Sequence, residues 1–239
     1  MIIYYHAVMS KIIAVANQKG GVGKTTTNVN LSACLAMAGK KVLTIDIDPQ
    51  GNTTSGLGVD KDKVDKSIYD VLINDVSISD AVVHTSIENL DIVVSNMQLA
   101  GAEIELVSMM AREMVLKRAL QGIRDDYDYI LIDCPPSLGL ITINALTASD
   151  KILVPIQCEY YALEGLSQLV NTVNLVRKHL NPTLEVEGVV LTMFDARTNL
   201  SIQVVEEVKR YFKNKVYRTI IPRNVKLGEA PSHGLPVVL

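Results

Sequence analysis

The stretch that most constrains this chain is QKGGVGKTTT, residues 18–27, which lies between an apolar run and a helix-like segment. Glycine carries no Cβ, so backbone amides at Gly20, Gly21 and Gly23 can converge on phosphate oxygens. A helix that begins near Lys24 would direct the positive end of its dipole at the same anion. The order of strand, glycine-rich loop and helix therefore predicts a phosphate-binding loop in an α/β fold.

Three side chains of this loop have predicted tasks. The Lys24 ammonium would reach the β- and γ-phosphates of a nucleotide, the Thr25 hydroxyl would bind Mg²⁺, and Thr26 would donate to a more inner phosphate. The loop departs from the general pattern G-x-x-x-x-G-K-[ST], because Gln18 occupies the first glycine position and a second lysine, Lys19, follows it. The general pattern leaves that second lysine unexplained.

Two further motifs place carboxylates at the ends of apolar strands. DIDPQGN, residues 46–52, offers Asp48 to orient an attacking water and Asp46 nearer the metal, although the same residues also suit an ordinary turn. YDYILIDCPPS, residues 127–137, has the Walker-B pattern, in which a buried strand presents one carboxylate, Asp133, to Mg²⁺. Beside a phosphate loop, this order of motifs favours a magnesium-dependent nucleotide site.

Apolar runs of strand length alternate with helix-like stretches along the 239 residues. The runs are rich in Ile and Val and mostly lack polar alternation, which suits strands that are covered on both faces. We therefore expect one α/β domain with a doubly wound, mostly parallel sheet flanked by helices, as in P-loop NTPases, and a loop over residues 51–65. The expected strands are residues 11–16, 41–46, 90–95, 128–133, 151–156, 186–192 and 216–221, and the expected helices are residues 24–38, 66–74, 99–123, 137–147, 161–179 and 200–213.

The composition and the N-terminus indicate where in the cell the protein resides. No apolar run approaches the roughly 18 residues of a membrane span, and three scattered cysteines without a C-x-x-C pair favour a reducing cytoplasm over a disulfide framework. The N-terminus lacks the basic segment and cleavage site of a signal peptide. Because MSKIIAVANQKGG at Met9 reads like a natural start, we expect residues 1–8 to be an extension of a single domain over residues 9–239.

The charge is distributed unevenly, although the formal net charge is only −3. Residues 189–239 hold eight Lys or Arg and four Asp or Glu, so a basic C-terminal part follows an acidic body. Such an asymmetry is typical of proteins that bind nucleic acid, and a solvated charged face on the last expected helix is the simpler alternative.

Together, KGGVGKTT, DIDPQGN, LIDCPPS and the late segment IPRNVKLGEAPSHG resemble the ParA/Soj partitioning ATPases of bacterial chromosomes and plasmids, within the deviant-Walker-A group that includes MinD. The similarity runs from about Met9 to the C-terminus, with the four motifs in the family's order. It implies ATP and Mg²⁺ as ligands, a slow ATPase, an ATP-dependent homodimer that binds DNA without sequence preference, and a ParB-type centromere-binding protein that stimulates hydrolysis. It also implies a cytoplasmic, nucleoid-associated role in chromosome partitioning or sporulation.

The resemblance assigns tasks to individual residues. Lys19 matches the signature lysine, which reaches across a nucleotide-sandwich dimer to the phosphates of the partner subunit. Asp48 would position the hydrolytic water, and Asp133 would support the metal. The residues that the resemblance implies are Lys19, Gly20, Gly21, Val22, Gly23, Lys24, Thr25, Thr26, Pro222 and Asn224 for the nucleotide, Thr25 and Asp133 for the metal, Lys19, Lys24 and Asp48 for catalysis, and Arg197 and Lys226 for DNA.

Two features depart from the family. Arginine is frequent in the family where this chain has Lys226, and lysine keeps the charge but loses the bidentate fork. Family members also continue past GEAPSHG with an arginine-containing segment and a last helix, whereas this chain stops at Leu239. We therefore expect the chain to be truncated at its C-terminus relative to the family.

Three other functions are open at this point. A MinD-like membrane-cycling ATPase would need a basic amphipathic helix at the C-terminus, and the residues up to Leu239 do not offer one. A redox protein of the nitrogenase-reductase kind would need paired cysteines, whereas Cys34, Cys134 and Cys158 are each expected to be small, buried hydrophobic residues. A ligase of the dethiobiotin-synthetase kind would need a further catalytic constellation, which the sequence does not display.

Overall fold

The structure is a computed structural model that describes residues 10–159 and 164–239, so the expected extension over residues 1–8 and the expected helix start at residue 161 lie outside it. The strands are β1 (Lys11–Val15), β2 (Val42–Asp46), β3 (Val82–His84), β4 (Leu90–Val93), β5 (Tyr129–Asp133), β6 (Lys151–Gln157), β7 (Glu185–Phe194) and β8 (Val216–Pro222). They form one eight-stranded sheet in the order β3-β4-β2-β5-β1-β6-β7-β8, in which only the β3–β4 pair is antiparallel.

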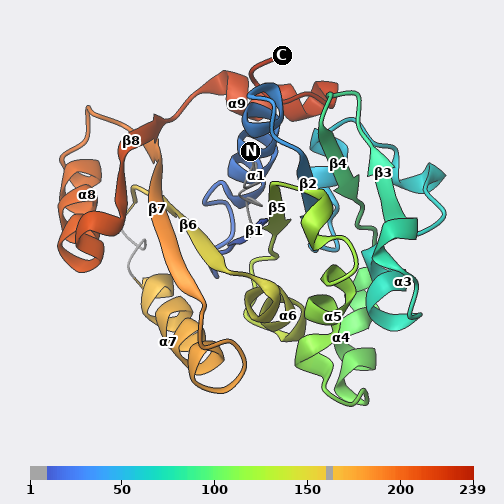
Figure 1. The fold of residues 1–239 in the computed structure, drawn as a ribbon. Helices are drawn as coiled ribbons and strands as arrows, with labels where there is room; N and C mark the ends of the chain where they lie inside the picture. The colour runs from blue at the N-terminus through green and yellow to red at the C-terminus, as the bar shows by residue number, and fades with distance from the viewer. Residues whose placement is uncertain (1–9, 160–163) are drawn as a thin grey trace, which may run out of the picture.

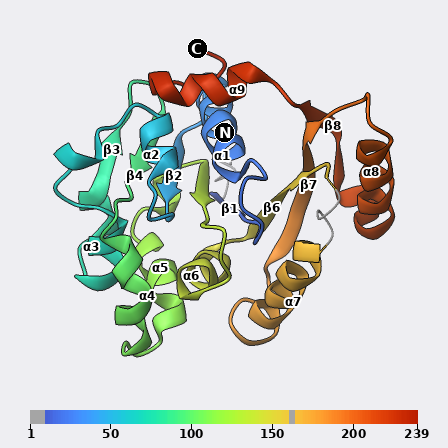
Figure 2. The same ribbon diagram turned by 180° about the vertical axis from the view of Figure 1, so that it is seen from behind.

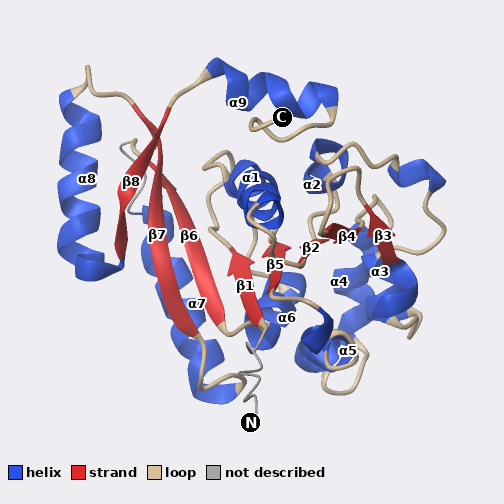
Figure 3. Ribbon diagram, turned by 45° about the horizontal axis from the view of Figure 1, so that its top comes forward, coloured by secondary structure: helices blue, strands red, loops and turns tan. Residues whose placement is uncertain are grey.

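Helices cover both faces of this sheet (Figure 1). They are α1 (Lys24–Met37), α2 (Asn52–Gly56), α3 (Ile68–Ile73), α4 (Leu99–Val107), α5 (Val115–Leu120), α6 (Leu140–Ala148), α7 (Glu164–His179), α8 (Asn199–Phe212) and α9 (Val225–Glu229). Helices α1, α2 and α9 lie on one side of the sheet, and α4, α5 and α6 lie on the other (Figure 3). The predicted doubly wound α/β fold with a mostly parallel sheet is confirmed.

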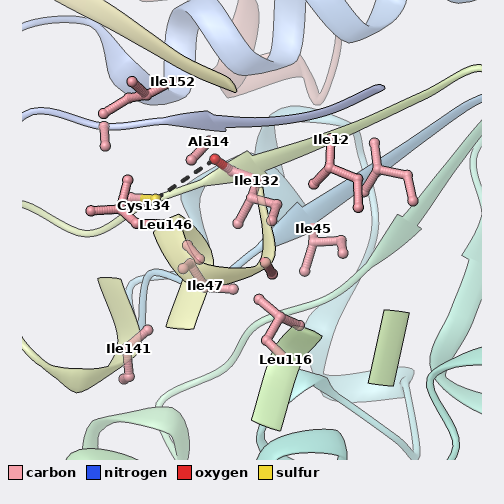
Figure 4. Close-up of a cluster of buried hydrophobic side chains, with 14 of the residues drawn as sticks. Ile12, Ala14, Ile45, Ile47, Leu116, Ile132, Cys134, Ile141, Leu146 and Ile152 are labelled. Carbon is pink, nitrogen blue, oxygen red and sulfur yellow. Dashed lines mark hydrogen bonds between the residues drawn. The ribbon is translucent and has the colours of Figure 1, made fainter. Parts of the chain in front are cut away.

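Aliphatic side chains hold the helices on the sheet, as expected for a chain without Trp. Under α1, buried Val29 and Ala33 pack with strand residues that include Val42 and Leu131. On the other face, a larger cluster joins the sheet to α5 and α6. Its side chains gather around Ile132 and Cys134, whose Sγ donates to the Ile132 carbonyl oxygen at 3.8 Å; Figure 4 shows Ile12, Ala14, Ile45, Ile47, Leu116, Ile141, Leu146 and Ile152 around them.

The central strands end at the same level, and this fixes the place of the site. Asp133 at the end of β5 is opposite Val15 of β1 on one side and opposite Asp46 of β2 on the other. The glycine-rich loop follows β1 directly, so it meets both carboxylates at the carboxyl edge of the sheet. This is where ligands bind in open α/β sheets.

The C-terminal segment crosses the same edge. After β8, residues 223–239 run over α1 and α2 (Figure 2). The Val237 amide donates to Asn30 Oδ1 of α1 at 2.8 Å. The segment thereby joins the far edge of the sheet to the elements around the glycine-rich loop.

The expected loop over residues 51–65 is wrong in part. Helix α2 begins at Asn52, and a 3₁₀ turn occupies Lys61–Lys63. The cause is tertiary, because the backbone amide and hydroxyl of Thr54 both donate to the buried carboxylate of Asp46, at 2.9 and 2.8 Å. Local composition carries no record of such a bond.

Two further expectations are wrong, and one strand was missed. The single helix over residues 99–123 is two helices, because the chain turns between them at Ala111, which has a left-handed φ of 50°. Strand β3 was not expected; it is a three-residue edge strand without a clear alternating pattern. Cys34 is exposed on α1, whereas Cys134 and Cys158 are buried as expected. Within the described residues, no helix is long and apolar enough to cross a bilayer.

Candidate nucleotide-binding site

The glycine-rich loop adopts a conformation that favours glycine at two points. Gly21 and Gly23 have φ values of 72° and 89°, where a side chain would strain the backbone. Gly23 is also the residue before α1, and no described side chain caps this helix. Its first-turn amides, which have no partner within the helix, are therefore available to an anion.

Two residues outside the glycine pattern, Asn17 and Thr192, hold the loop in place through hydrogen bonds. Asn17 donates through Nδ2 to the Pro155 carbonyl oxygen at 2.7 Å and accepts from the Lys19 amide at 3.0 Å. Thr192 of β7 donates through Oγ1 to the Val22 carbonyl oxygen at 2.8 Å. The side chain of Val22 is itself buried, so this part of the loop is fixed on the sheet.

Lys24 lies inside the loop and is buried. Its Nζ donates to the Lys19 carbonyl oxygen at 3.1 Å. Burial lowers the pKa of Lys24, and the charge of Asp133 opposes this shift. An anion in the loop would favour the charged ammonium in the same way that Asp133 does.

Asp133 is the centre of the site's hydrogen bonds. Its Oδ2 accepts from the Thr25 and Thr53 hydroxyls, each at 2.8 Å. Its Oδ1 is buried and has no partner among the described residues. Burial, with the charge of Asp46 as a second cause, raises the pKa of Asp133 to about 7.

These residues fit a hydrated magnesium ion. Mg²⁺ prefers oxygen ligands, keeps several waters, and is commonly held by one carboxylate and a hydroxyl beside phosphates. The unpartnered Oδ1 of Asp133 can accept from a metal-bound water, and the Thr25 hydroxyl already lies beside the same carboxylate. The described part of the chain shows no cluster of three His, Cys, Asp or Glu residues that could hold a metal.

The two acids of the DIDPQGN motif have different surroundings. Asp46 is completely buried and accepts from both the amide and the hydroxyl of Thr54 and from the Asp48 amide. Burial raises the pKa of Asp46 to about 6. Asp48 lies past the strand end and accepts from the Gln50 amide at 3.0 Å. The Asp46 carboxylate therefore bonds α2, whereas the Asp48 carboxylate, which is also buried, bonds the turn that follows β2.

The remaining predicted residues lie on two other segments. Pro222 ends β8, and the Oδ1 of Asn224 accepts from the Lys226 amide at 2.8 Å at the start of α9. Arg197 lies between β7 and α8 and forms a two-pronged ion pair with Asp195, at 2.9 and 2.7 Å. The Arg197 side chain is nevertheless 88% exposed. The structure thus brings Lys19–Thr26, Asp48 and Asp133 together, and places the other four elsewhere along the C-terminal half.

Sequence reasoning missed three threonines of the site. Thr53 and Thr54 bond Asp133 and Asp46. The hydroxyl-rich NTTS run after DIDPQG marks them as candidate polar residues, although the sequence does not show which acids they bond. No sequence signal marks Thr192, since it lies 170 residues beyond the carbonyl group that it bonds.

The chain matches known proteins over most of its length. A family model described as an AAA domain, AAA_31, matches residues 10–186. The sporulation initiation inhibitor protein Soj of Bacillus subtilis is 66% identical over 231 residues, which cover 97% of this chain and 91% of that protein. The chromosome partitioning protein ParA of Myxococcus xanthus is 54% identical over 98% of this chain and 82% of its own length.

Solved structures share the fold over most of the chain. A cobyrinic acid a,c-diamide synthase from Mycobacterium smegmatis with bound ADP and magnesium has a TM-score of 0.86 and 41% identity, and the match covers 95% of this chain and 93% of that one. Apo McdA from Cyanothece has a TM-score of 0.88 and 26% identity, with 96% and 92% covered. The phosphate loop, the Walker-B carboxylate and these relatives together show that the chain belongs to the ParA/Soj family of chromosome-partitioning ATPases.

Proposed function

We propose that this protein is a slow, Mg²⁺-dependent ATPase that acts as a dimerising switch in chromosome or plasmid partitioning. ATP joins two subunits, the dimer binds DNA without sequence preference, and hydrolysis releases it. The observation that carries the proposal is the hydrogen bond from Thr25 to Asp133 at the uncapped start of α1, beside the buried ammonium of Lys24. The structural relative with bound ADP and magnesium supports this choice of ligand.

Within this proposal different residues bind the phosphates, the metal ion, the attacking water and the adenine. The amides of Gly20–Thr26 and the Lys24 ammonium bind the phosphates, because both supply positive charge to the same small volume. Thr25 and Asp133 hold Mg²⁺, which neutralises phosphate charge when bound. Asp48 orients the attacking water, and Pro222 and Asn224 hold the adenine.

Lys19 is the residue that makes the switch depend on a second subunit. Its side chain belongs to the rim of the loop and is half-buried, whereas Lys24 occupies the interior. A cation supplied from the partner subunit stabilises charge on the transferred phosphoryl group, as an arginine finger does. ATP would therefore link the two subunits, and loss of the γ-phosphate would weaken the link.

DNA binding is assigned to the basic C-terminal part, with Arg197 and Lys226 as contacts. Both residues are exposed. The ion pair with Asp195 is compatible with this role, because exposed pairs contribute little and a phosphate can replace the carboxylate at the same guanidinium. Binding of this kind would hold the dimer at the nucleoid, where a ParB-type protein would stimulate hydrolysis.

The proposal is tested by DNA binding in ATP, in ADP and without nucleotide, each at two salt concentrations. We expect binding with ATP alone, weakened strongly by salt, because released counterions drive phosphate contacts. Arg197→Ala and Lys226→Ala should each weaken binding and reduce the salt slope by about 1. Equal binding in all three nucleotide states would contradict the switch, and ATP-dependent binding to anionic vesicles in place of DNA would favour the MinD-like alternative.

A further inference from the structure

We propose that Thr192 is a positioning residue of the nucleotide site: it holds the phosphate loop from β7 and connects it to the loop over residues 195–198. The inference rests on the proposed function and adds a physical link between its two halves, the ATP site and the Arg197 surface.

Thr192 lies beside two residues of the phosphate loop, Val22 and Gly23. Its hydroxyl donates to the Val22 carbonyl oxygen at 2.8 Å, and its Cγ2 lies 3.7 Å from the position that a Cβ on Gly23 would take. Thr192 is 4% exposed, so it cannot turn away into solvent. Strand β6 lies between β1 and β7 in the sheet, and the contact therefore bridges over a whole strand.

The residue after Thr192 has an unusual backbone. Met193 has a φ of 51°, in the left-handed region that favours glycine, and the pairing of β7 with β8 shifts register between Leu191 and Phe194. A non-glycine residue persists in this conformation only where its surroundings determine it, and such residues gather at functional sites. This irregularity lies between the phosphate-loop contact and the loop that carries Arg197.

The loop over residues 195–198 is closed by its own hydrogen bonds. The Asp195 carboxylate accepts from the backbone amide and the guanidinium of Arg197, and the Asp195 carbonyl oxygen accepts from the Thr198 amide. The loop is therefore expected to move as one unit with the end of β7.

A second connection leaves the same residue. The Thr192 carbonyl oxygen accepts from the Cys158 amide at 3.1 Å, and the Cys158 carbonyl oxygen accepts from the Ser201 hydroxyl of α8 at 3.1 Å. Close-packed interiors do not deform continuously, so a shift of the phosphate loop at Val22 must be taken up along these two connections. The first connection reaches the loop that carries Arg197, and the second reaches Ser201 in the first turn of α8.

The test compares Thr192→Val, which keeps the shape of the side chain but removes the hydroxyl, with Thr192→Ser, which keeps the hydroxyl. Thr85→Val is the matched control, because the Thr85 hydroxyl also donates to a backbone carbonyl, that of Leu90 at 2.7 Å, at the opposite edge of the sheet. Two quantities are measured: the affinity for a non-hydrolysable ATP analogue with Mg²⁺, and amide hydrogen exchange over residues 193–198 with and without saturating analogue.

We expect Thr192→Val to weaken analogue binding about fivefold, the size of one buried hydrogen bond. In the unmodified protein the analogue should slow exchange over residues 193–198. At saturation Thr192→Val should lose this slowing, whereas Thr192→Ser and Thr85→Val should keep it. Met193→Gly, which relieves the left-handed strain, should keep analogue affinity but show a smaller change in exchange.

Several outcomes would overturn the inference. One is a Thr192→Val variant that binds the analogue as tightly as the unmodified protein and shows the same slowing of exchange over residues 193–198. A second is a Thr85→Val variant that loses affinity and slowing to the same extent as Thr192→Val. A third is exchange over residues 193–198 that does not change when the unmodified protein binds the analogue. DNA binding is measured in parallel. If exchange responds to the analogue but DNA does not bind, the proposed function fails and the role of Thr192 stands.

Discussion

Gly58 and Gly234 lie against each other with no room for a side chain on either. A Cβ on Gly58 would lie 2.9 Å from the Gly234 carbonyl oxygen, and a Cβ on Gly234 would lie 2.7 Å from Gly58 Cα. Both residues have positive φ values, 73° and 66°. The contact fixes the C-terminal segment on the chain that follows α2, whose threonines bond the buried acids of the site.

Gly58→Ala is therefore expected to destabilise the protein by about 2–4 kcal/mol, because it adds a clash with backbone to the cost of a left-handed alanine. Gly39→Ala is the control: Gly39 has a φ of 80°, but a Cβ added there would meet no atom within 4 Å, so a loss of about 1–2 kcal/mol is expected. Urea unfolding of the two variants measures the difference. Equal losses would show that the Gly58–Gly234 contact contributes nothing.

The fold was largely predictable from the sequence because its strands are covered on both faces. Runs such as IIAVA and YILI carry no charged residue, and the alternation of such runs with helical segments leaves few topologies. The phosphate loop was equally predictable, since Gly21 and Gly23 occupy backbone conformations that few other residues adopt.

The features that were missed could not be predicted from the local sequence. Helix α2 forms where Thr54 bonds Asp46, and the break between α4 and α5 depends on a left-handed Ala111, neither of which local composition records. Cys34 lies on α1 at a position that is exposed to solvent. The contact of Thr192 with the phosphate loop needed three-dimensional structure, because no periodicity relates positions so far apart.

The three cysteines should differ in reactivity. Cys34 is exposed, whereas Cys134 and Cys158 are buried. Burial raises the pKa of Cys158 to about 11, so only about one thiol in a thousand is a thiolate at pH 8. A chromogenic disulfide reagent at pH 8 should modify one thiol rapidly in the folded protein and three in denaturant. Cys34→Ser should remove the rapid phase, and a rapid phase that survives in this variant would contradict the burial of the other two.

Lys19→Ala should separate nucleotide binding from dimerisation. Lys24 and the loop amides remain, so some ATP binding is expected to survive, but the cation proposed to act on the partner's phosphates is lost. Light scattering after gel filtration with Mg²⁺ and an ATP analogue should give a dimer for the unmodified protein and a monomer for the variant. Lys40→Ala, which removes an exposed lysine after α1, is the control. A Lys19→Ala dimer that forms only with the analogue would exclude the proposed role in trans.

Hydrolysis is proposed to end the DNA-bound state, and the release of DNA after a limited addition of ATP tests this most directly. Asp48→Ala removes the carboxylate proposed to orient water but none of the groups proposed to hold phosphate or metal; Asp62→Ala removes an exposed acid as the control. We predict that the unmodified protein and Asp62→Ala bind DNA and then leave it as ADP accumulates, while Asp48→Ala binds and stays. Release of Asp48→Ala at the rate of the unmodified protein, or DNA binding that outlasts ATP in the unmodified protein, would contradict the account.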